Sequence, residues 1–135
     1  MSFRTIKFRG RRTNGDWMYG IFIPEEYSWW GVPSIANKNF RYEVQEDTIG
    51  QYTGYNDSDG TEVYEGDILS FTSYGIDGGY IEHFCDVVKF LMGTWQIDGR
   101  DDVTYNLACL LLRDYFKSKV IGNIHDNPEL LEDKK

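Results

Sequence analysis

The stretch DTIGQYTGYNDSDGTEVYEGDILSF, from Asp47 to Phe71, decides the fold that we predict for this chain. Three short apolar segments in it are separated by residues that form turns. Asn56 to Gly60 combines Asn, Asp, Ser and Gly, which favour tight turns because their side chains bond nearby backbone or allow positive φ angles. Ile68 and Leu69 then start a strand that we expect to be buried. The stretch therefore predicts short antiparallel strands, and the rest of the chain extends this pattern.

The composition supports the same class. The chain has 135 residues, including ten Tyr, eight Phe, four Trp and 14 Gly. Aromatic side chains fit the pleated surface of a sheet, and glycines supply turns. We predict a mainly β fold, either a small β-barrel or a two-sheet sandwich, with at most one short helix. We expect one domain over residues 1–135, with 132–135 as a frayed tail.

Upstream of the central stretch, the sequence predicts a hairpin and a further strand. Phe3 to Arg9 alternates in polarity, and Asn14-Gly15 is a strong hairpin signal before a returning strand over Asp16 to Ile23. Glu25 to Asn39 has no regular pattern, so we expect a loop. Phe40 to Gln45 alternates again and predicts a strand.

Downstream, we expect a long strand over Tyr80 to Leu91 and, after a turn at Gly93, another strand over Thr94 to Ile97. Leu107 to Tyr115 has apolar residues at helical spacing, although a buried strand fits almost as well. Lys119 to Ile124 predicts a last strand, and Pro128 to Leu131 a closing turn.

The net charge of −8 argues against nucleic acid as a partner, since binding phosphates requires clustered Lys and Arg. Cys85 and Cys109 do not make a disulfide framework, and the N-terminus lacks the apolar core of a signal peptide. No apolar run has the length of a membrane span. We therefore expect a cytoplasmic protein that does not bind membranes.

Three separated segments resemble the YopX family of proteins encoded by bacteriophages and prophages. They are Ile6 to Arg9; Thr48 to Gly54 with Asp57 to Gly60 and Val63 to Ile68; and Val120 to Ile124 with Asn127 to Leu131. Two departures occur: the chain has Gly10-Arg11 where the family usually has Ala-Trp, and Tyr55 where it commonly has Leu.

The resemblance implies a β-barrel or sandwich, a phage origin and a bacterial host cell, but no established activity. We expect structural roles for the motif residues that it covers. These are Gly50, Gln51, Tyr52, Thr53, Gly54, Asp59, Gly60, Tyr64, Glu65, Gly66, Asp67, Gly122 and Asn123.

The aromatic residues Tyr27, Trp29 and Trp30 are the leading candidates for function. Large rings in a loop either cover the core or bind a partner, and Trp and Tyr are enriched in binding hot spots. We expect a non-catalytic module that binds a protein, or a second copy of itself in a homo-oligomer, with acidic residues around the rings.

A second candidate is a basic, aromatic face across the first hairpin. Arg9, Arg11 and Arg12 with Trp17 and Tyr19 could grip single-stranded nucleic acid, with phosphates on the arginines and bases on the rings. The alternative is a solvated hairpin whose arginines pair with the surplus of acids.

Glu65 and Asp67 would point to one face of a strand, and paired carboxylates can serve a hydrolase. No His or Lys stands nearby, so turn formation around Gly66 is the simpler reading and we expect no enzyme.

We expect no metal or cofactor. Asp57, Asp59 and Gly60 lack the end ligands of a calcium loop. The spacing of His83, Cys85, Cys109 and His125 fits no paired zinc-ligand pattern.

Overall fold

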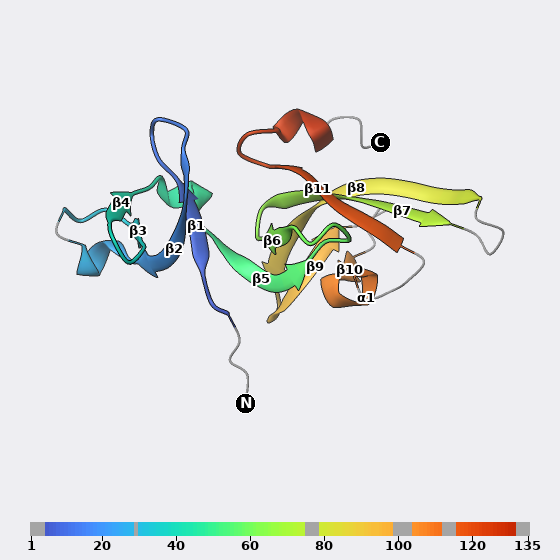
Figure 1. Ribbon diagram of the computed structural model, residues 1–135, viewed down its shortest axis with the longest axis horizontal. Helices are drawn as coiled ribbons and strands as arrows, with labels where there is room; N and C mark the ends of the chain where they lie inside the picture. The colour runs from blue at the N-terminus through green and yellow to red at the C-terminus, as the bar shows by residue number, and fades with distance from the viewer. Residues whose placement is uncertain (1–4, 29, 75–78, 99–103, 112–115, 132–135) are drawn as a thin grey trace. The chain divides into compact units, whose positions relative to one another are not determined.

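The computed structural model describes residues 5–28, 30–74, 79–98, 104–111 and 116–131. Their strands form two antiparallel sheets, and one short helix accompanies the second sheet (Figure 1). The prediction of a mainly β fold with at most one short helix is confirmed. Within the described ranges neither sheet closes into a barrel, so the two-sheet alternative is the one that fits. The chain divides into two compact units, Met1–Gly54 and Tyr55–Lys135, each described here by itself.

The first unit contains an antiparallel sheet with the strand order β4-β3-β2-β1-β5. Its last strand, β5, continues into the second unit, where β6 is its neighbour. The elements are β1 (Phe8–Arg11), β2 (Trp17–Ile23), η1 (Glu25–Tyr27), β3 (Ser34–Ala36), β4 (Arg41–Glu43), η2 (Glu46–Thr48) and β5 (Gly50–Asn56).

The Asn14-Gly15 hairpin is confirmed. Gly15 has a φ of 95°, and the Arg12 backbone N–H donates to the Asp16 carbonyl at 2.8 Å. Strand β1 begins at Phe8, so residues 5–7 lie outside it, which corrects the predicted strand there; Phe3 and Arg4 lie outside the described residues. The reason is pairing: Phe8 is the first residue flanked on both sides, by Gly20 of β2 and Gln51 of β5.

Strand β3 lies inside the segment Glu25 to Asn39, which the sequence predicted to be an irregular loop. It pairs with β2 through Phe22 and Ile35, and with β4 beyond it. Gly20 makes this pairing feasible, because a Cβ at that position would overlap the Ala36 carbonyl oxygen. A three-residue strand gives little periodic signal, so only its neighbours define it.

The second unit contains a sheet with the order β10-β9-β8-β7-β11. Strand β8 has the predicted bounds, and the helix alternative for residues 107–111 is confirmed; residues 112–115 lie outside the described ranges. The elements are β6 (Glu62–Tyr64), β7 (Asp67–Tyr74), β8 (Tyr80–Leu91), β9 (Thr94–Asp98), β10 (Thr104–Asn106), α1 (Leu107–Leu111), β11 (Phe116–Asn123) and η4 (Pro128–Leu131). Strand β10 had no sequence prediction.

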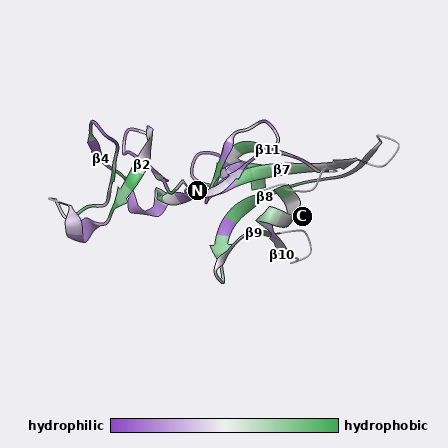
Figure 2. Cartoon of the chain, turned by 60° about the horizontal axis from the view of Figure 1, so that its bottom comes forward, coloured by the Kyte–Doolittle hydropathy of each residue, from purple (hydrophilic) through white to green (hydrophobic). Residues whose placement is uncertain are grey.

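The hydrophobic core of the second unit lies on its sheet. Figure 2 shows hydrophobic stretches along β7 and β8. Phe71 and Phe84 stack with ring centroids 5.0 Å apart. The buried core cluster consists of Val63, Leu69, Phe71, Phe84, Val88, Ile97 and Leu107.

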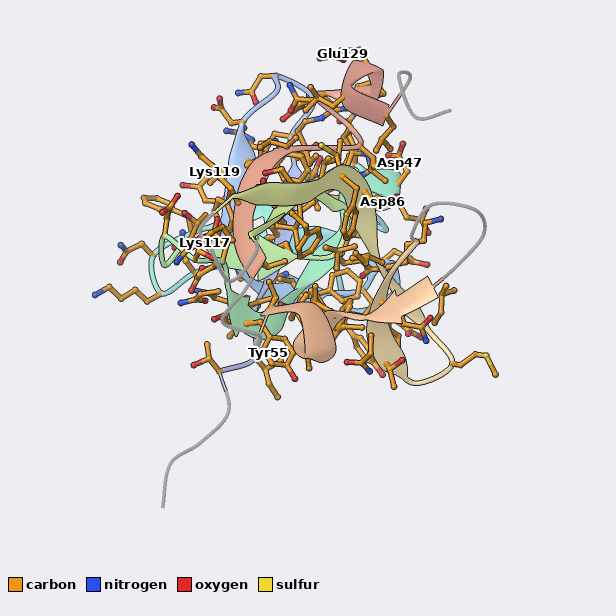
Figure 3. The ribbon with its side chains drawn as sticks, turned by 90° about the vertical axis from the view of Figure 1, so that its right-hand side faces the viewer. Asp47, Tyr55, Asp86, Lys117, Lys119 and Glu129 are labelled. Atoms are coloured by element: carbon orange, nitrogen blue, oxygen red, sulfur yellow. The ribbon has the colours of Figure 1, made fainter. Side chains whose placement is uncertain are left out.

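The predicted turn at Asn56 to Gly60 lies beside β11, on the side away from β7, and bonds to its backbone. Buried Asp57 accepts the N–H groups of Asp59 and Thr61 on Oδ1, and that of Val120 on Oδ2, each at 2.9 Å. Ser58 bonds to Ser118 through backbone and hydroxyl groups. This turn therefore occupies backbone groups of β11 at Ser118 and Val120. Lys117 and Lys119 project from the same strand and are exposed (Figure 3).

A second turn follows β11. Asn123 Oδ1 accepts the N–H groups of His125 and Asp126, both at 2.9 Å. A Cβ on Gly122 would lie 2.5 Å from Asn127 Oδ1, so a side chain at this position would displace Asn127. The Gly122-Asn123 motif therefore shapes this turn.

Candidate functional site

The aromatic loop after β2 presents its rings to solvent. The exposed fractions are 72% for Tyr27 and 77% for Trp30, while Trp29 lies outside the described residues. Two consecutive tight turns produce this exposure: Ser28 N–H donates to the Glu25 carbonyl at 3.1 Å, and Gly31 N–H donates to the Ser28 carbonyl at 3.3 Å. Tyr27 and Trp30 are thus surface side chains rather than core.

Trp30 borders a cavity of about 320 Å³, lined also by Ser28, Ser34, Arg41 and Glu43 and called here the Trp30 cavity. Arg41 and Glu43 lie opposite Ala36 and Ser34 across the β3–β4 pair, so all four share one face of the sheet. Ser34 is fully buried, and its Oγ has no hydrogen-bond partner within the described part of the chain. The exposed ring therefore stands beside a hollow that contains polar groups.

A neighbouring hollow of about 420 Å³, the Arg12 cavity, lies at the edge strand β4. The Arg12 guanidinium lies over the Tyr42 ring, 5.2 Å from its centroid. Gln45 N–H donates to the Arg11 carbonyl at 2.8 Å, which holds the end of β1 against the segment after β4. The lining residues are Arg12, Thr13, Val32, Arg41, Tyr42, Glu43, Val44 and Gln45.

The structure brings four of the five predicted hairpin residues together. Arg9 pairs with Tyr19 and Arg11 with Trp17 in the β1–β2 register, so these side chains share a face. The guanidinium groups of Arg9 and Arg11 lie 4.7 and 6.0 Å from the Trp17 ring centroid. Arg12 instead contacts Tyr42.

These contacts weaken the case for nucleic acid. Arg9 is only 5% exposed, which leaves little of its guanidinium accessible to a phosphate. Arg11 Nε donates to Gln45 Oε1 at 3.2 Å, and its backbone N–H donates to Thr48 Oγ1 at 2.8 Å. Cation–π stacking on Trp17 and these bonds indicate that Arg9 and Arg11 stabilise the sheet.

The carboxylate pair Glu65 and Asp67 flanks a tight turn at Gly66, whose φ is 90°. Asp67 is 2% exposed, and its Oδ2 accepts the Tyr64 backbone N–H at 2.7 Å. Gly66 N–H donates to the Val88 carbonyl at 2.9 Å. This geometry supports the structural role predicted for Asp67, since a carboxylate closed off by backbone does not reach a substrate.

The other motif residues also lie at strand and turn positions. Gly50 and Gln51 pair with β1, Thr53 is buried, and Gly54 and Gly60 have φ angles of 87° and 86°.

Of the four His and Cys side chains considered as zinc ligands, the structure describes two. Cys85 and His125 are half-buried, and the side chains of His83 and Cys109 lie outside the description. Among the described residues, no group of three or more His, Cys, Asp or Glu is arranged to hold a metal ion.

Charge divides unevenly between the two units. Residues 1–54 contain seven Lys and Arg against six Asp and Glu, a net charge of +1. Residues 55–135 contain seven against sixteen, a net charge of −9, and the two values give the −8 of the chain. The acidic bulk composition therefore does not describe the first unit.

Sequence reasoning missed Arg41 and Glu43. The alternation of Phe40 to Gln45 places them on one face of a strand. The residues around them are set by pairing with β3, which lacks a sequence signal. Arg12 was identified as a hairpin residue, but not as a neighbour of Tyr42.

The strands, turns and exposed aromatic loop define a small two-sheet β protein. The chain belongs to the YopX family: the model of the family described as YopX protein matches residues 7–132, which confirms the resemblance. That match includes both compact units.

The fold is also similar to the crystal structure of protein EF1440 from Enterococcus faecalis. The TM-score is 0.58 at 24% sequence identity, with 96% of this chain and 99% of that chain covered. No curated protein matches the chain. Among the helices that the structure describes, none is long and apolar enough to cross a membrane.

Proposed function

We propose that this protein is a non-catalytic module that binds a protein partner through the Tyr27–Trp30 loop. The observation that carries the proposal is the 77% exposure of Trp30 beside the Trp30 cavity. An exposed indole is unfavourable in water, and a hollow next to it offers a partner a shaped surface. Tyr27, three residues earlier, is a second exposed ring, and the exposed residues Glu25 and Glu26 precede it in the chain.

Burial of the rings contributes a substantial part of the free energy that recognition requires. Covering the exposed part of Trp30 removes roughly 150–200 Å² of ring surface from water, worth about 4–5 kcal/mol before the costs of association. Trp and Tyr also lose little conformational entropy on binding, because each has only two side-chain torsions.

The partner is a protein of the bacterial cell in which a phage or prophage gene is expressed, or a second copy of this chain. The family membership supports this setting, since YopX-like proteins are encoded by phages and prophages. The acidic residues beside the rings favour a partner surface that carries Lys or Arg.

Replacing Trp30 by Ala tests the proposal. We expect capture of partner from host lysate, or self-association measured by light scattering, to weaken at least tenfold, because truncation of a hot-spot ring costs more than about 1.4 kcal/mol. Phe40→Ala is the matched control, since Phe40 is 62% exposed in the same unit but lines neither cavity. Equal binding by the wild type and a folded Trp30→Ala variant would overturn the proposal.

A further inference from the structure

We propose that the Arg12 cavity is an oxyanion site, which binds the phosphate or carboxylate group of a small ligand. This inference does not rest on protein binding by the aromatic loop. It starts from two arginines that come from different parts of the sequence, Arg12 after β1 and Arg41 in β4, and that line one hollow.

The Arg12 guanidinium is held by its neighbours. It lies 5.2 Å from the Tyr42 ring centroid. The main chain of Arg12 is fixed separately, since its N–H donates to the Asp16 carbonyl at 2.8 Å. Stacking on a ring fixes the plane of a guanidinium while leaving its N–H edges available to an acceptor. Arg12 is therefore presented as a donor of fixed orientation.

Neutral groups complete the hydrogen-bonding capacity of the hollow. Thr13 contributes a hydroxyl group and Gln45 an amide. Gln45 Oε1 already accepts a bond from Arg11 Nε, which orients the Gln45 amide. A volume of about 420 Å³ lies within the range of small-molecule sites, roughly 300–1,000 Å³.

The charges favour an anion over a cation. Arg12 and Arg41 outnumber the one acid of the lining, Glu43, and the first unit carries a net charge of +1 in a chain whose total is −8. Guanidinium groups match the geometry of phosphate and carboxylate oxygens. The Glu43 carboxylate repels an anion, so we expect substitutions at Arg41 and at Glu43 to change the affinity for the anion in opposite directions.

The test is a titration of the isotope-labelled protein, followed by backbone amide NMR at constant ionic strength. Inorganic pyrophosphate and succinate serve as the two probes. Saturating shifts of the Tyr42 and Gln45 amides with either probe support the site, and the probe that causes them shows whether the site binds phosphate or carboxylate. We expect Arg41→Gln to weaken binding about tenfold and Glu43→Gln to strengthen it about two- to fivefold. Lys38→Gln is the control, because Lys38 is exposed in the same unit and lines neither cavity.

The spectra report folding of every variant directly. Chemical shifts that do not saturate with either probe would overturn the inference. It would also be overturned if Arg41→Gln and Glu43→Gln left the affinity for both probes unchanged. Because the titration contains no partner protein, this outcome is separate from the result with Trp30→Ala.

Discussion

At the scale of single residues, Asp57 shows how one buried carboxylate organises distant backbone. Its two oxygens bond to N–H groups of its own turn and to Val120, 63 positions away. An Ala side chain removes these charge-assisted bonds, so we expect Asp57→Ala to lower the free energy of unfolding by roughly 2–4 kcal/mol. Urea denaturation measures the change.

Asp59→Ala is the matched control in the same turn. Asp59 is exposed, and the bond that Asp57 accepts from it uses its backbone N–H, which alanine retains. We expect a change within about 0.5 kcal/mol. A similar loss of stability in both variants would contradict the role assigned to the Asp57 side chain.

At the scale of elements, the β8–β9 hairpin has an unfavourable turn residue. Met92 has a φ of 51° and Gly93 a φ of 81°, in the two-residue connection between Leu91 and Thr94. Positive φ at both positions is the type I′ pattern, which prefers Asn-Gly. Met92 is also 97% exposed, so no packing compensates for its backbone conformation.

We therefore expect Met92→Asn to stabilise the protein by about 0.5–1 kcal/mol, because Asn tolerates the left-handed region better. A higher urea midpoint with an unchanged slope is the expected result. Met92→Val should shift the midpoint the other way, since a branched Cβ disfavours positive φ. An Asn variant less stable than the wild type would refute this assignment of strain.

The elements predicted correctly from sequence have strong local signals. Asn14-Gly15 marks a turn by itself, and Tyr80 to Leu91 is a long run rich in aromatic and β-branched residues. Strands β3 and β10 have three residues each and depend on pairing with neighbours, which local patterns do not encode. Arg12 and Arg41 line one hollow only because β3 pairs with β2 and β4, and for this reason the Arg12 cavity could not be predicted.

At the scale of the whole molecule, the two units differ in buried apolar surface. Among the described residues, the first unit buries the apolar side chains Ile35 and Val44, whereas the second buries ten. Hydrophobic burial is the main favourable contribution to folding, so the first unit should open more readily.

Hydrogen exchange tests this expectation. Amides of β2 and β3 should exchange at least tenfold faster than those of β7 and β8, because less buried apolar surface lowers the free energy of local opening. Equal protection of the strands in both units would show that the chain opens as one cooperative whole.

The turn at Asp57 and Ser58 has a consequence for how copies of the chain behave toward one another. A terminal strand such as β11 offers unsatisfied backbone groups, which can template an added strand from another molecule and start aggregation. Here the turn already occupies those groups at Ser118 and Val120, and Lys117 and Lys119 add charge along the strand. The β11 edge of the second sheet is thus protected against fibril growth by a turn of the central stretch.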